Sequence, residues 1–279
     1  MGTADRQIGF IGGGNMGQAI MRGLIQAGHS PRLLSVADPD RTCRAELRNL
    51  HAELFISPDN LAVAEKADAL VLAVKPQMIR TVAEETAESE CPPDQMIVSI
   101  AAGTTIGSLH AWLGSEVPVV RVMPNQPALI GAGISVLTPS ANVTEPQREL
   151  ADYIANAIGT AIWLDDESLI DAATAVSGSG PAYFYLLMEL IENSALEFGF
   201  SKDVASKLTV GTALGAARIA DSVGPDLADL RRRVTSPGGT TAAALKVLED
   251  AEIRDIFRRA LEAARDRSAE LGKSGSSND

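Results

Sequence analysis

The sequence predicts an α/β fold, with a doubly wound parallel sheet in the N-terminal part and an all-helical region after it. Two observations lead to this prediction. Short apolar runs alternate with helical patterns through about the first 160 residues, which is typical of strand–helix–strand units. From about residue 165 the strand signal stops and only helical patterns continue. We therefore predict a first domain at 1–164, a helical domain at 165–272 and a disordered, Ser/Gly/Asn-rich tail at 273–279.

Six runs in the first domain are predicted strands, because each is apolar on both faces, as expected of parallel strands that helices cover. They are Gln7–Ile11, Leu33–Ala37, Leu54–Ile56, Ala69–Val74, Met96–Ile100 and Val117–Val122. Helical patterns lie between them at Met16–Ala27 and Arg41–Asn49. Further helix starts are indicated at Ser57-Pro58 and Thr104/Thr105.

The helical domain begins with a segment that is apolar almost all the way round, Pro181–Phe198. Such a helix must be covered on several sides, by its own domain or by another subunit. The next helix, Val204–Ala220, is rich in small residues that let helices approach closely. Further helices are predicted at Asp226–Val234, Thr240–Leu248 and Ile253–Leu271.

Composition and charge argue against several classes of function. The chain has 24 basic and 36 acidic residues, and its formal net charge of −12 disfavours nucleic acid or an anionic membrane as a partner. Cys43 and Cys91 show no CxxC or Cys/His spacing, so we predict neither a metal site nor a disulfide. Without a signal-peptide pattern or an apolar run of about 18 residues, the sequence predicts a cytoplasmic protein. Since no histidine follows His110, the helical domain has no histidine acid.

A glycine-rich turn joins the first predicted strand to the first helix. Residues 9–17 read GFIGGGNMG, which contains the pattern G-x-G-x-x-G. We expect Gly12 to permit the tight turn, Gly14 to let the backbone approach a pyrophosphate, and Gly17 to allow close packing of the helix. The start of the helix supplies free N–H groups and a positive dipole end to the same site. The pattern predicts a Rossmann domain that binds NADPH or NADH, and a glycine turn that serves only packing is the alternative.

Asp38 follows the second predicted strand, where a carboxylate would hydrogen-bond the adenosine ribose and repel a 2′-phosphate. Arg41 and Arg44 follow closely and could instead neutralise such a phosphate. The alternative role for Asp38 is that of a helix N-cap in Asp38-Pro39-Asp40. We expect NADH to be usable and leave NADPH open.

A second glycine-rich segment, Thr235-Ser236-Pro237-Gly238-Gly239-Thr240-Thr241, precedes a predicted helix. Backbone amides at a helix start, with hydroxyls beside them, suit a carboxylate. An ordinary capped helix start would have the same composition.

The residues 235–249, TSPGGTTAAALKVLE, resemble the signature of pyrroline-5-carboxylate reductases. Four more segments resemble that family in order and spacing, and the likeness extends over nearly the whole chain apart from the tail. They are GFIGGGNMG, Ala73-Val74-Lys75-Pro76, Arg121-Val122-Met123-Pro124-Asn125 and Val176-Ser177-Gly178-Ser179-Gly180-Pro181-Ala182-Tyr183. Two positions depart from the family: Gln126 stands where MPNTP has threonine, and Asp38 stands where many members carry serine, threonine or Asn-Arg.

The resemblance implies a Rossmann domain followed by a helical dimerisation domain, a homodimer or a ring of dimers, and reduction of 1-pyrroline-5-carboxylate to L-proline by NADPH or NADH. It places the cofactor on Gly12, Gly14, Asn15, Met16, Gly17, Asp38, Asn60, Val74, Lys75 and Ala102. It places the substrate on Ser236, Gly238, Gly239, Thr240, Thr241 and Glu167, with the Thr241 hydroxyl near the ring nitrogen as the catalytic group. A cyclic imine can take its proton from water, so a strong enzymic acid is not required.

Four other functions remain as alternatives, and the first of them is a related imine reductase. A β-hydroxyacid dehydrogenase needs a lysine in a GxxGxGxxxK helix, whereas here no lysine follows Gly178 before Lys202. A non-catalytic NAD(P)-binding regulatory module would not need the segment 236–241, and an interaction scaffold would use the apolar helix for docking. The sequence does not determine cofactor preference, oligomer number, feedback by proline or activity on ring-size analogues.

Overall fold

Residues 2–224 and 226–276 are described by the computed structural model of the chain. They form two compact units, of which the first comprises the residues up to Ser179 together with those from Ala264 onward. The second comprises Gly180–Ala263. This division differs from the predicted boundary at 164/165, because the helix and turn that follow residue 165 pack with the sheet.

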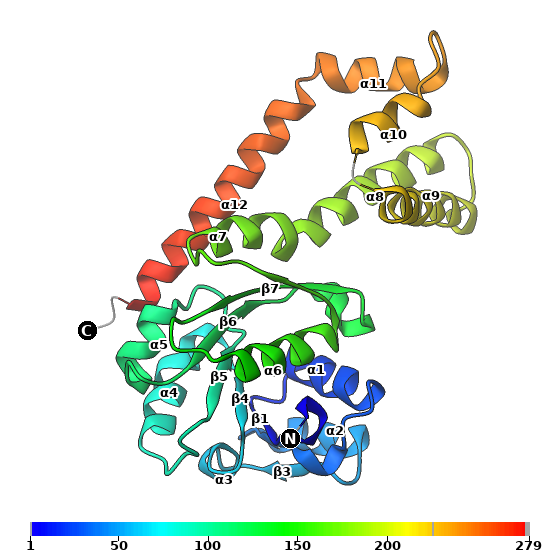
Figure 1. Cartoon of the computed structure of the whole chain (residues 1–279). Coiled ribbons are helices and arrows are strands. Elements are labelled where there is room, and N and C mark those ends of the chain that lie inside the picture. Colours follow the sequence, from blue (N-terminus) through cyan, green and yellow to red (C-terminus); the bar gives the residue numbers. More distant parts are fainter. Residues whose placement is uncertain (1, 225, 277–279) are drawn as a thin grey trace. The chain divides into compact units, whose positions relative to one another are not determined.

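In the described residues of the first unit, eight strands form one sheet, in the order β3-β2-β1-β4-β5-β6-β7-β8 (Figure 1). The strands are β1 (Ile8–Ile11), β2 (Leu34–Ala37), β3 (Phe55–Ser57), β4 (Ala69–Leu72), β5 (Met96–Ser99), β6 (Val119–Met123), β7 (Gly133–Pro139) and β8 (Gly159–Trp163). Strands β1 to β6 are parallel, while β7 runs antiparallel to β6 and parallel to β8. The doubly wound sheet and its six predicted strands are therefore confirmed.

Strands β7 and β8 were not predicted. β7 begins with a glycine, ends with a proline and buries Ser135 and Thr138, so it is not a run of apolar residues. β8 lies at the edge of the sheet, where its residues are only half-buried or exposed. A search for strands that are apolar on both faces therefore misses both.

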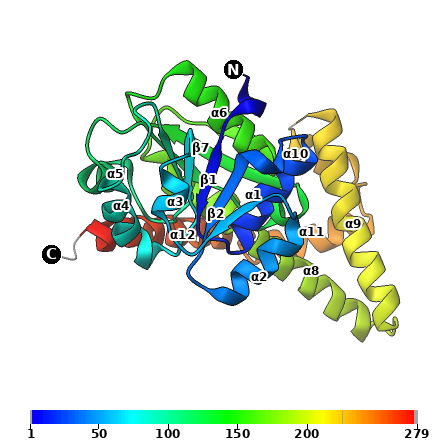
Figure 2. The same cartoon turned by 90° about the horizontal axis from the view of Figure 1, so that it is seen from below.

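Helices cover the two faces of the sheet (Figures 1 and 2). Their bounds are α1 (Asn15–Gln26), α2 (Arg41–Leu50), α3 (Leu61–Ala64), α4 (Ile79–Ala87), α5 (Ile106–Leu113), α6 (Glu145–Asn156) and α7 (Leu169–Ala173), and a π-helical turn follows at Thr174–Gly178. One apolar core packs α1, α2 and α6 against Ile8 and Phe10, and the other packs α3, α4 and α5 against Ile11 and Leu72. Because helices pack against both faces of the sheet, the central strands are apolar on both sides.

The described residues of the second unit are helical, as the sequence predicts. The helices are α8 (Gly180–Glu197), α9 (Lys202–Val223), α10 (Leu227–Arg233), α11 (Thr240–Asp250) and α12 (Ile253–Ser276), the last of which ends in the first unit. Apolar side chains on α8 and α9 stay exposed in the single chain, among them Phe184 at 66% and Leu190 at 54%.

The prediction of a disordered tail at 273–279 is wrong for 273–276, because the backbone of α12 continues to Ser276. The sequence Arg267–Leu271 is helix-forming, and its helix propagates into the Ser/Gly-rich segment. Residues 277–279 lie outside the described residues.

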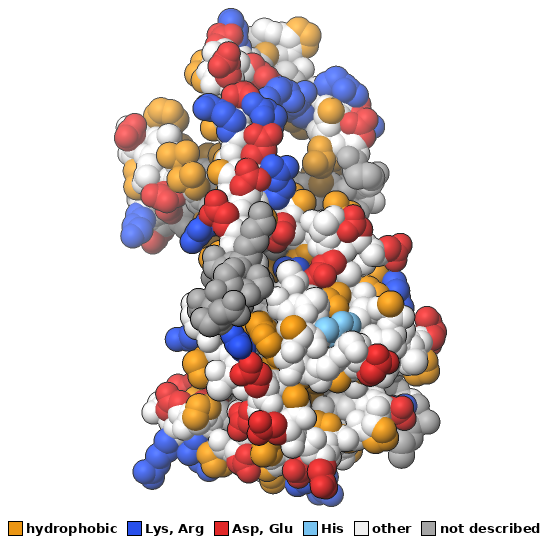
Figure 3. Space-filling model, turned by 90° about the vertical axis from the view of Figure 1, so that its left-hand side faces the viewer, with side chains coloured by type: hydrophobic (Ala, Val, Ile, Leu, Met, Phe, Trp, Pro, Cys, Tyr) orange, Lys and Arg blue, Asp and Glu red, His pale blue; other side chains and the backbone are white. Residues whose placement is uncertain are grey.

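Acidic and basic side chains are intermingled on the face of the molecule that Figure 3 shows. Along α12, ion pairs join side chains three or four residues apart, such as Arg258 with Glu262 and Arg259 with Asp255. None of the helices within residues 2–224 and 226–276 has the length and apolar character needed to cross a bilayer.

Candidate active site

The predicted cofactor residues gather at the carboxyl edge of the sheet, all within the first unit. Each group follows a different strand, and the groups are Gly12–Gly17 after β1, Asp38 after β2, Asn60 after β3, Val74 and Lys75 after β4, and Ala102 after β5. The chain winds from β1 to β3 in one direction and then crosses to β4 on the other side of β1. Ligands of doubly wound sheets bind at the carboxyl edge where the winding reverses, which here is between β1 and β4.

The three glycines of the loop meet different requirements. Gly12 has a φ of +100°, and a Cβ there would lie 2.6 Å from the carbonyl oxygen of Ala73. A Cβ at Gly17 would lie 2.7 Å from the carbonyl oxygen of Gly12, so the bare glycine lets α1 approach the turn. A Cβ at Gly14 would meet no atom within 4 Å. The loop is therefore closed toward the protein and open at Gly14, which fits a pyrophosphate lying against its backbone.

Gly13 is a loop residue that the sequence analysis missed, because the motif allows any residue there. A Cβ on Gly13 would lie 2.5 Å from Leu47 Cδ1 and 3.0 Å from Cys43 Sγ, both on α2. The Gly13 carbonyl accepts hydrogen bonds from Gln18 Nε2 at 2.8 Å and from the Cys43 thiol at 3.0 Å. Burial and the nearby Asp38 carboxylate raise the pKa of the Cys43 thiol to about 12, so it remains a protonated donor.

Asp38 joins β2 to the phosphate loop. Its Oδ2 accepts the Gly13 N–H at 2.9 Å and its Oδ1 accepts the Asp40 N–H at 2.8 Å. The N-cap of α2 is Asp40, whose Oδ1 accepts the Thr42 N–H at 2.7 Å, so the proposed capping role of Asp38 is wrong. Arg44 donates from Nη1 to the carbonyls of Asp38 and Pro39, each at 2.8 Å. Each carboxylate oxygen has two lone pairs, so Asp38 retains capacity for ribose hydroxyls.

The remaining cofactor candidates differ in their surroundings. The side-chain amide of Asn60 donates to Glu85 Oε2 at 2.7 Å, which ties the start of α3 to α4. Val74 is half-buried, whereas Lys75 and Ala102 are exposed at the strand ends. These two residues are therefore accessible to a bound molecule.

Glu167 lies in the first unit and is held by two donors. Its Oε1 accepts the N–H of Ile106, the first residue of α5, at 2.8 Å and the Nη1 of Arg121 at 2.8 Å. Arg121 was not among the predicted site residues. Arg121 interrupts an otherwise apolar predicted strand, and such a charge must have a partner when it is buried. That signal could have identified the pair.

Two of the quoted motifs lie against each other in the first unit. Asn125, after β6, accepts the Ile134 N–H on Oδ1 at 2.9 Å and donates from Nδ2 to the Ser177 carbonyl at 3.0 Å. A Cβ on Gly178 would lie 2.9 Å from Met123 Cε. The adjacent Gln126 is exposed. Asn125 thus fixes the π-helical turn, an element often found at functional sites.

The second unit contains the segment 235–241. Gly238 has a φ of +70°, and Gly239 is the N-cap of α11, where a Cβ would collide with Ser236 Oγ. No side chain caps α11, and its first amides, which include those of Thr240 and Thr241, have no partner within the helix. The hydroxyl of Thr235 donates to the Arg231 carbonyl at 2.6 Å. This uncapped start differs from an ordinary capped helix and suits an anion.

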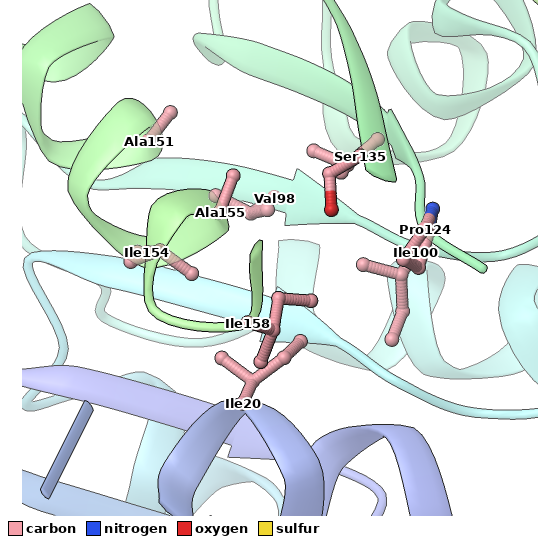
Figure 4. Close-up of a pocket in the computed structure, with 10 residues that line it drawn as sticks. Ile20, Val98, Ile100, Pro124, Ser135, Ala151, Ile154, Ala155 and Ile158 are labelled. Atoms are coloured by element: carbon pink, nitrogen blue, oxygen red, sulfur yellow. The ribbon is translucent and has the colours of Figure 1, made fainter. Parts of the chain in front are cut away.

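A metal site and an internal cavity are weaker candidates for a functional site. In the described residues, no group of three or more His, Cys, Asp and Glu side chains is placed to hold a metal ion. A cavity in the core of the first unit, which Ser135 Oγ faces in Figure 4, has a volume of about 10 Å³. This volume holds at most one water molecule. The cavity is therefore a packing defect rather than a ligand site.

Comparisons with known proteins cover both units. The sequence profile of the family described as "Pyrroline-5-carboxylate reductase dimerisation" matches residues 167–271, and that of "NADP oxidoreductase coenzyme F420-dependent" matches residues 7–103. The pyrroline-5-carboxylate reductase of Pseudomonas aeruginosa is 46% identical over 267 residues, which are 96% of this chain and 97% of that protein. The one from Methanosarcina acetivorans is 38% identical over 272 residues, covering 96% of this chain and 99% of that protein.

Solved structures show the same likeness. A pyrroline-5-carboxylate reductase from Coxiella burnetii has a TM-score of 0.90 and 39% identity, covering 95% of this chain and 98% of that chain. A pyrroline carboxylate reductase from Plasmodium falciparum with NADP bound has a TM-score of 0.85 and 29% identity, covering 96% and 98%. A ketol-acid reductoisomerase with 14% identity and a TM-score of 0.66 shares the fold alone.

Proposed function

The chain belongs to the pyrroline-5-carboxylate reductase family, and we propose that it reduces the cyclic imine 1-pyrroline-5-carboxylate to L-proline with NADPH or NADH. The observation that carries this proposal is the 46% identity to a named reductase over 96% of the chain, because it spans both groups of site residues. The open face of the glycine loop and the uncapped start of α11 support it independently.

The cofactor would be held along the carboxyl edge of the sheet. The amides at the start of α1, including those of Asn15 and Met16, would bind the pyrophosphate, and Asp38 would bind the adenosine ribose. Asn60, Val74, Lys75 and Ala102 would line the rest of the site. NAD(P)H, when bound, supplies a hydride to the imine carbon.

The substrate carboxylate would be held by the segment 236–241. The amides of Thr240 and Thr241 and the hydroxyl of Ser236 would bind it, since the N-terminal end of α11 carries a partial positive charge. The Gly239 N–H donates to the Ser236 carbonyl at 3.1 Å, so Gly239 would shape the turn rather than bind the carboxylate. Gly238 shapes the turn with its positive φ. The Thr241 hydroxyl would hydrogen-bond the ring nitrogen and orient the proton that the imine takes from water.

Steady-state kinetics on the purified chain test this proposal. Loss of nicotinamide absorbance should depend on 1-pyrroline-5-carboxylate, and the product should be identified as L-proline by mass spectrometry. A saturated ring, L-proline itself, offered with NADPH is the matched control and should give no loss of absorbance. Cofactor binding without any oxidation by the imine would contradict the proposal and favour a regulatory NAD(P)-binding module.

Asp38 supports use of NADH. A carboxylate that binds the adenosine ribose would repel a 2′-phosphate. Arg44, which could have neutralised that phosphate, donates from Nη1 to the carbonyls of Asp38 and Pro39. We therefore propose that NADH is used at least as well as NADPH. Parallel titrations of the two cofactors at saturating imine measure this, and a strong preference for NADPH would contradict it.

Self-association follows from the match to a dimerisation family. We propose a homodimer or a ring of such dimers, in which the exposed apolar faces of α8 and α9 are covered by a partner. Light scattering on the eluted protein should give a mass of at least twice the 29.2 kDa chain. A monomer at micromolar concentration would contradict the homodimer, and a bare dimer would exclude the ring.

A cytoplasmic location stays a prediction as well. It rests on the expectation from the sequence that Cys43 and Cys91 form no disulfide, which fits a reducing compartment. Fractionation of cells that express the chain at native level would test it.

A further inference from the structure

The loop between β5 and α5, residues 100–105, carries the exposed Ala102 and is held in place by a network of charged side chains. At its amino end, the Ile100 N–H donates to the Leu72 carbonyl of β4 at 3.2 Å. At its carboxyl end, the Thr105 hydroxyl accepts the Ser108 N–H at 3.1 Å. The position of Ala102 therefore depends on where α5 begins.

Glu167 fixes the position of the first residue of α5. Its Oε1 accepts the Ile106 N–H at 2.8 Å, so a side chain 61 residues further along the chain caps the first helical residue. The negative carboxylate also suits the positive end of the helix. Since Thr105 caps a different amide, the two caps together anchor the carboxyl end of the loop.

Arg121 on β6 fixes Glu167 in turn. Its guanidinium is 6% exposed and donates to Glu167 Oε1 at 2.8 Å, with Asp171 Oδ1 at 4.0 Å from its Nη2. A buried guanidinium needs such carboxylate partners, because desolvation otherwise makes it very costly. The central sheet thereby determines the position of Glu167.

The end of α12 closes the outer side of the same loop. The Ser268 hydroxyl, on a side chain that is nearly buried, donates to Asp171 Oδ1 at 2.7 Å. A Cβ on Gly103 would lie 3.3 Å from the backbone of Leu271, so the helix end packs directly against the loop. Figures 1 and 2 show this red end of α12 beside α5. The network thus extends from β6 to the C-terminal helix, entirely within the first unit.

We propose that Glu167 and Arg121 are positioning residues for the cofactor, which act by fixing the loop that carries Ala102, and that Glu167 does not contact the substrate. This inference rests on the proposed cofactor contact at Ala102. The family resemblance implies that Glu167 contacts the substrate. The inference gives Glu167 a different role, because both of its observed hydrogen-bond donors, the Ile106 N–H and Arg121 Nη1, belong to the protein itself.

Binding titrations of NADPH and NADH, followed by nucleotide fluorescence without any imine, test the proposal. Glu167→Ala should raise the Kd for the nucleotide roughly five- to tenfold, the effect of losing a cap and an ion-pair partner. Glu167→Gln should recover much of this loss, because its amide oxygen still accepts the Ile106 N–H. Glu53→Gln, which removes a glutamate from a surface pair with Arg32, is the matched control and should leave Kd unchanged.

The Michaelis constant for the imine separates the two roles of Glu167. We expect this Michaelis constant to change less than twofold in Glu167→Gln. If Glu167 contacted the substrate, Glu167→Gln would raise the Michaelis constant and leave the nucleotide Kd as in wild type. The latter result would overturn the proposal. Should Glu167→Ala not fold, Ser268→Ala provides a milder perturbation that should raise Kd about twofold. Unchanged nucleotide binding in Glu167→Ala, or in Ser268→Ala if Glu167→Ala does not fold, would also overturn it. Because the titration contains no imine, its outcome is independent of whether wild-type enzyme reduces pyrroline-5-carboxylate.

Discussion

The two glycine-rich segments of the chain differ in what holds them in place. A Cβ on Gly12, Gly13 or Gly17 would meet protein atoms at 2.5–2.7 Å, and the loop is bonded by Asp38, Gln18 and Cys43. In the segment 235–241, Gly239 would meet only Ser236 of the same turn, and Gly238 meets nothing within 4 Å. The cofactor loop is therefore built by distant parts of its own unit. The substrate segment is shaped by local turn chemistry and is open to further partners.

The largest expected effect comes from closing the first loop. Gly12→Ala places a Cβ at a φ of +100° and 2.6 Å from the Ala73 carbonyl oxygen, so it should weaken NAD(P)H binding roughly a hundredfold. Gly238→Ala, also at a positive φ but in open space, is the matched control and should leave nucleotide binding unchanged. Calorimetric titration measures both. Equal losses in the two variants would contradict the difference drawn between the loops.

The second largest effect concerns the substrate segment. Thr241→Ala should lower kcat about tenfold, because the ring nitrogen loses a hydrogen bond. The Kd for the nucleotide should not change. Thr241→Ser, which keeps the hydroxyl, should restore turnover, and Thr235→Ala should affect stability alone because that hydroxyl bonds the Arg231 carbonyl. Unchanged turnover in Thr241→Ala would remove this residue from the mechanism.

A smaller effect is expected at the edge of the cofactor site. Asp38→Ser removes the carboxylate that accepts the Gly13 N–H. Because this carboxylate would repel the 2′-phosphate of NADPH, the ratio of NADPH to NADH use should rise roughly fivefold. Competition experiments between the two nucleotides measure the ratio. Asp40→Ser keeps a residue able to cap α2 and should leave the ratio unaltered. A ratio that falls in Asp38→Ser would contradict the assigned role.

The smallest expected effect is a pH dependence of stability that differs between the two units. Burial lowers the pKa of His29 below its ordinary value of 6.5, so the folded protein keeps this ring neutral. Below pH 6.5 the unfolded chain binds more protons than the folded one, and the free energy of unfolding falls as pH decreases from 7 to 5. The loss should be confined to the first unit. The second unit contains no histidine.

Denaturant unfolding at pH 7 and pH 5, with hydrogen exchange to locate the loss, checks this prediction. His29→Gln should show a smaller difference between the two pH values than wild type. His51→Gln should keep the wild-type difference. Equal pH dependence in wild type and His29→Gln would show that other groups account for the effect.

Much of the fold was predictable because the signals are local. The central strands are apolar on both faces, and helix starts such as Thr105 have capping residues beside them. The reasons expected for Gly12 and Gly17 agree with the contacts a Cβ would make there. Strands β7 and β8 escaped prediction because partial exposure and buried hydroxyls remove the apolar signal. The helix at 273–276 escaped because propagation from α12 outweighs local composition.

The sequence by itself determined the strand–turn–helix at Gly12–Gly17, the helical second half and the resemblance that names the family. Only the tertiary structure decided which residues meet across long separations. Arg121 and Glu167 lie 46 residues apart in sequence, and Gly13 and Asp38 lie 25 apart. Periodicity reports whether a side chain is buried, but it carries no information about the partner. A buried charge or a bare glycine acquires its role only when the sheet brings that partner within contact distance.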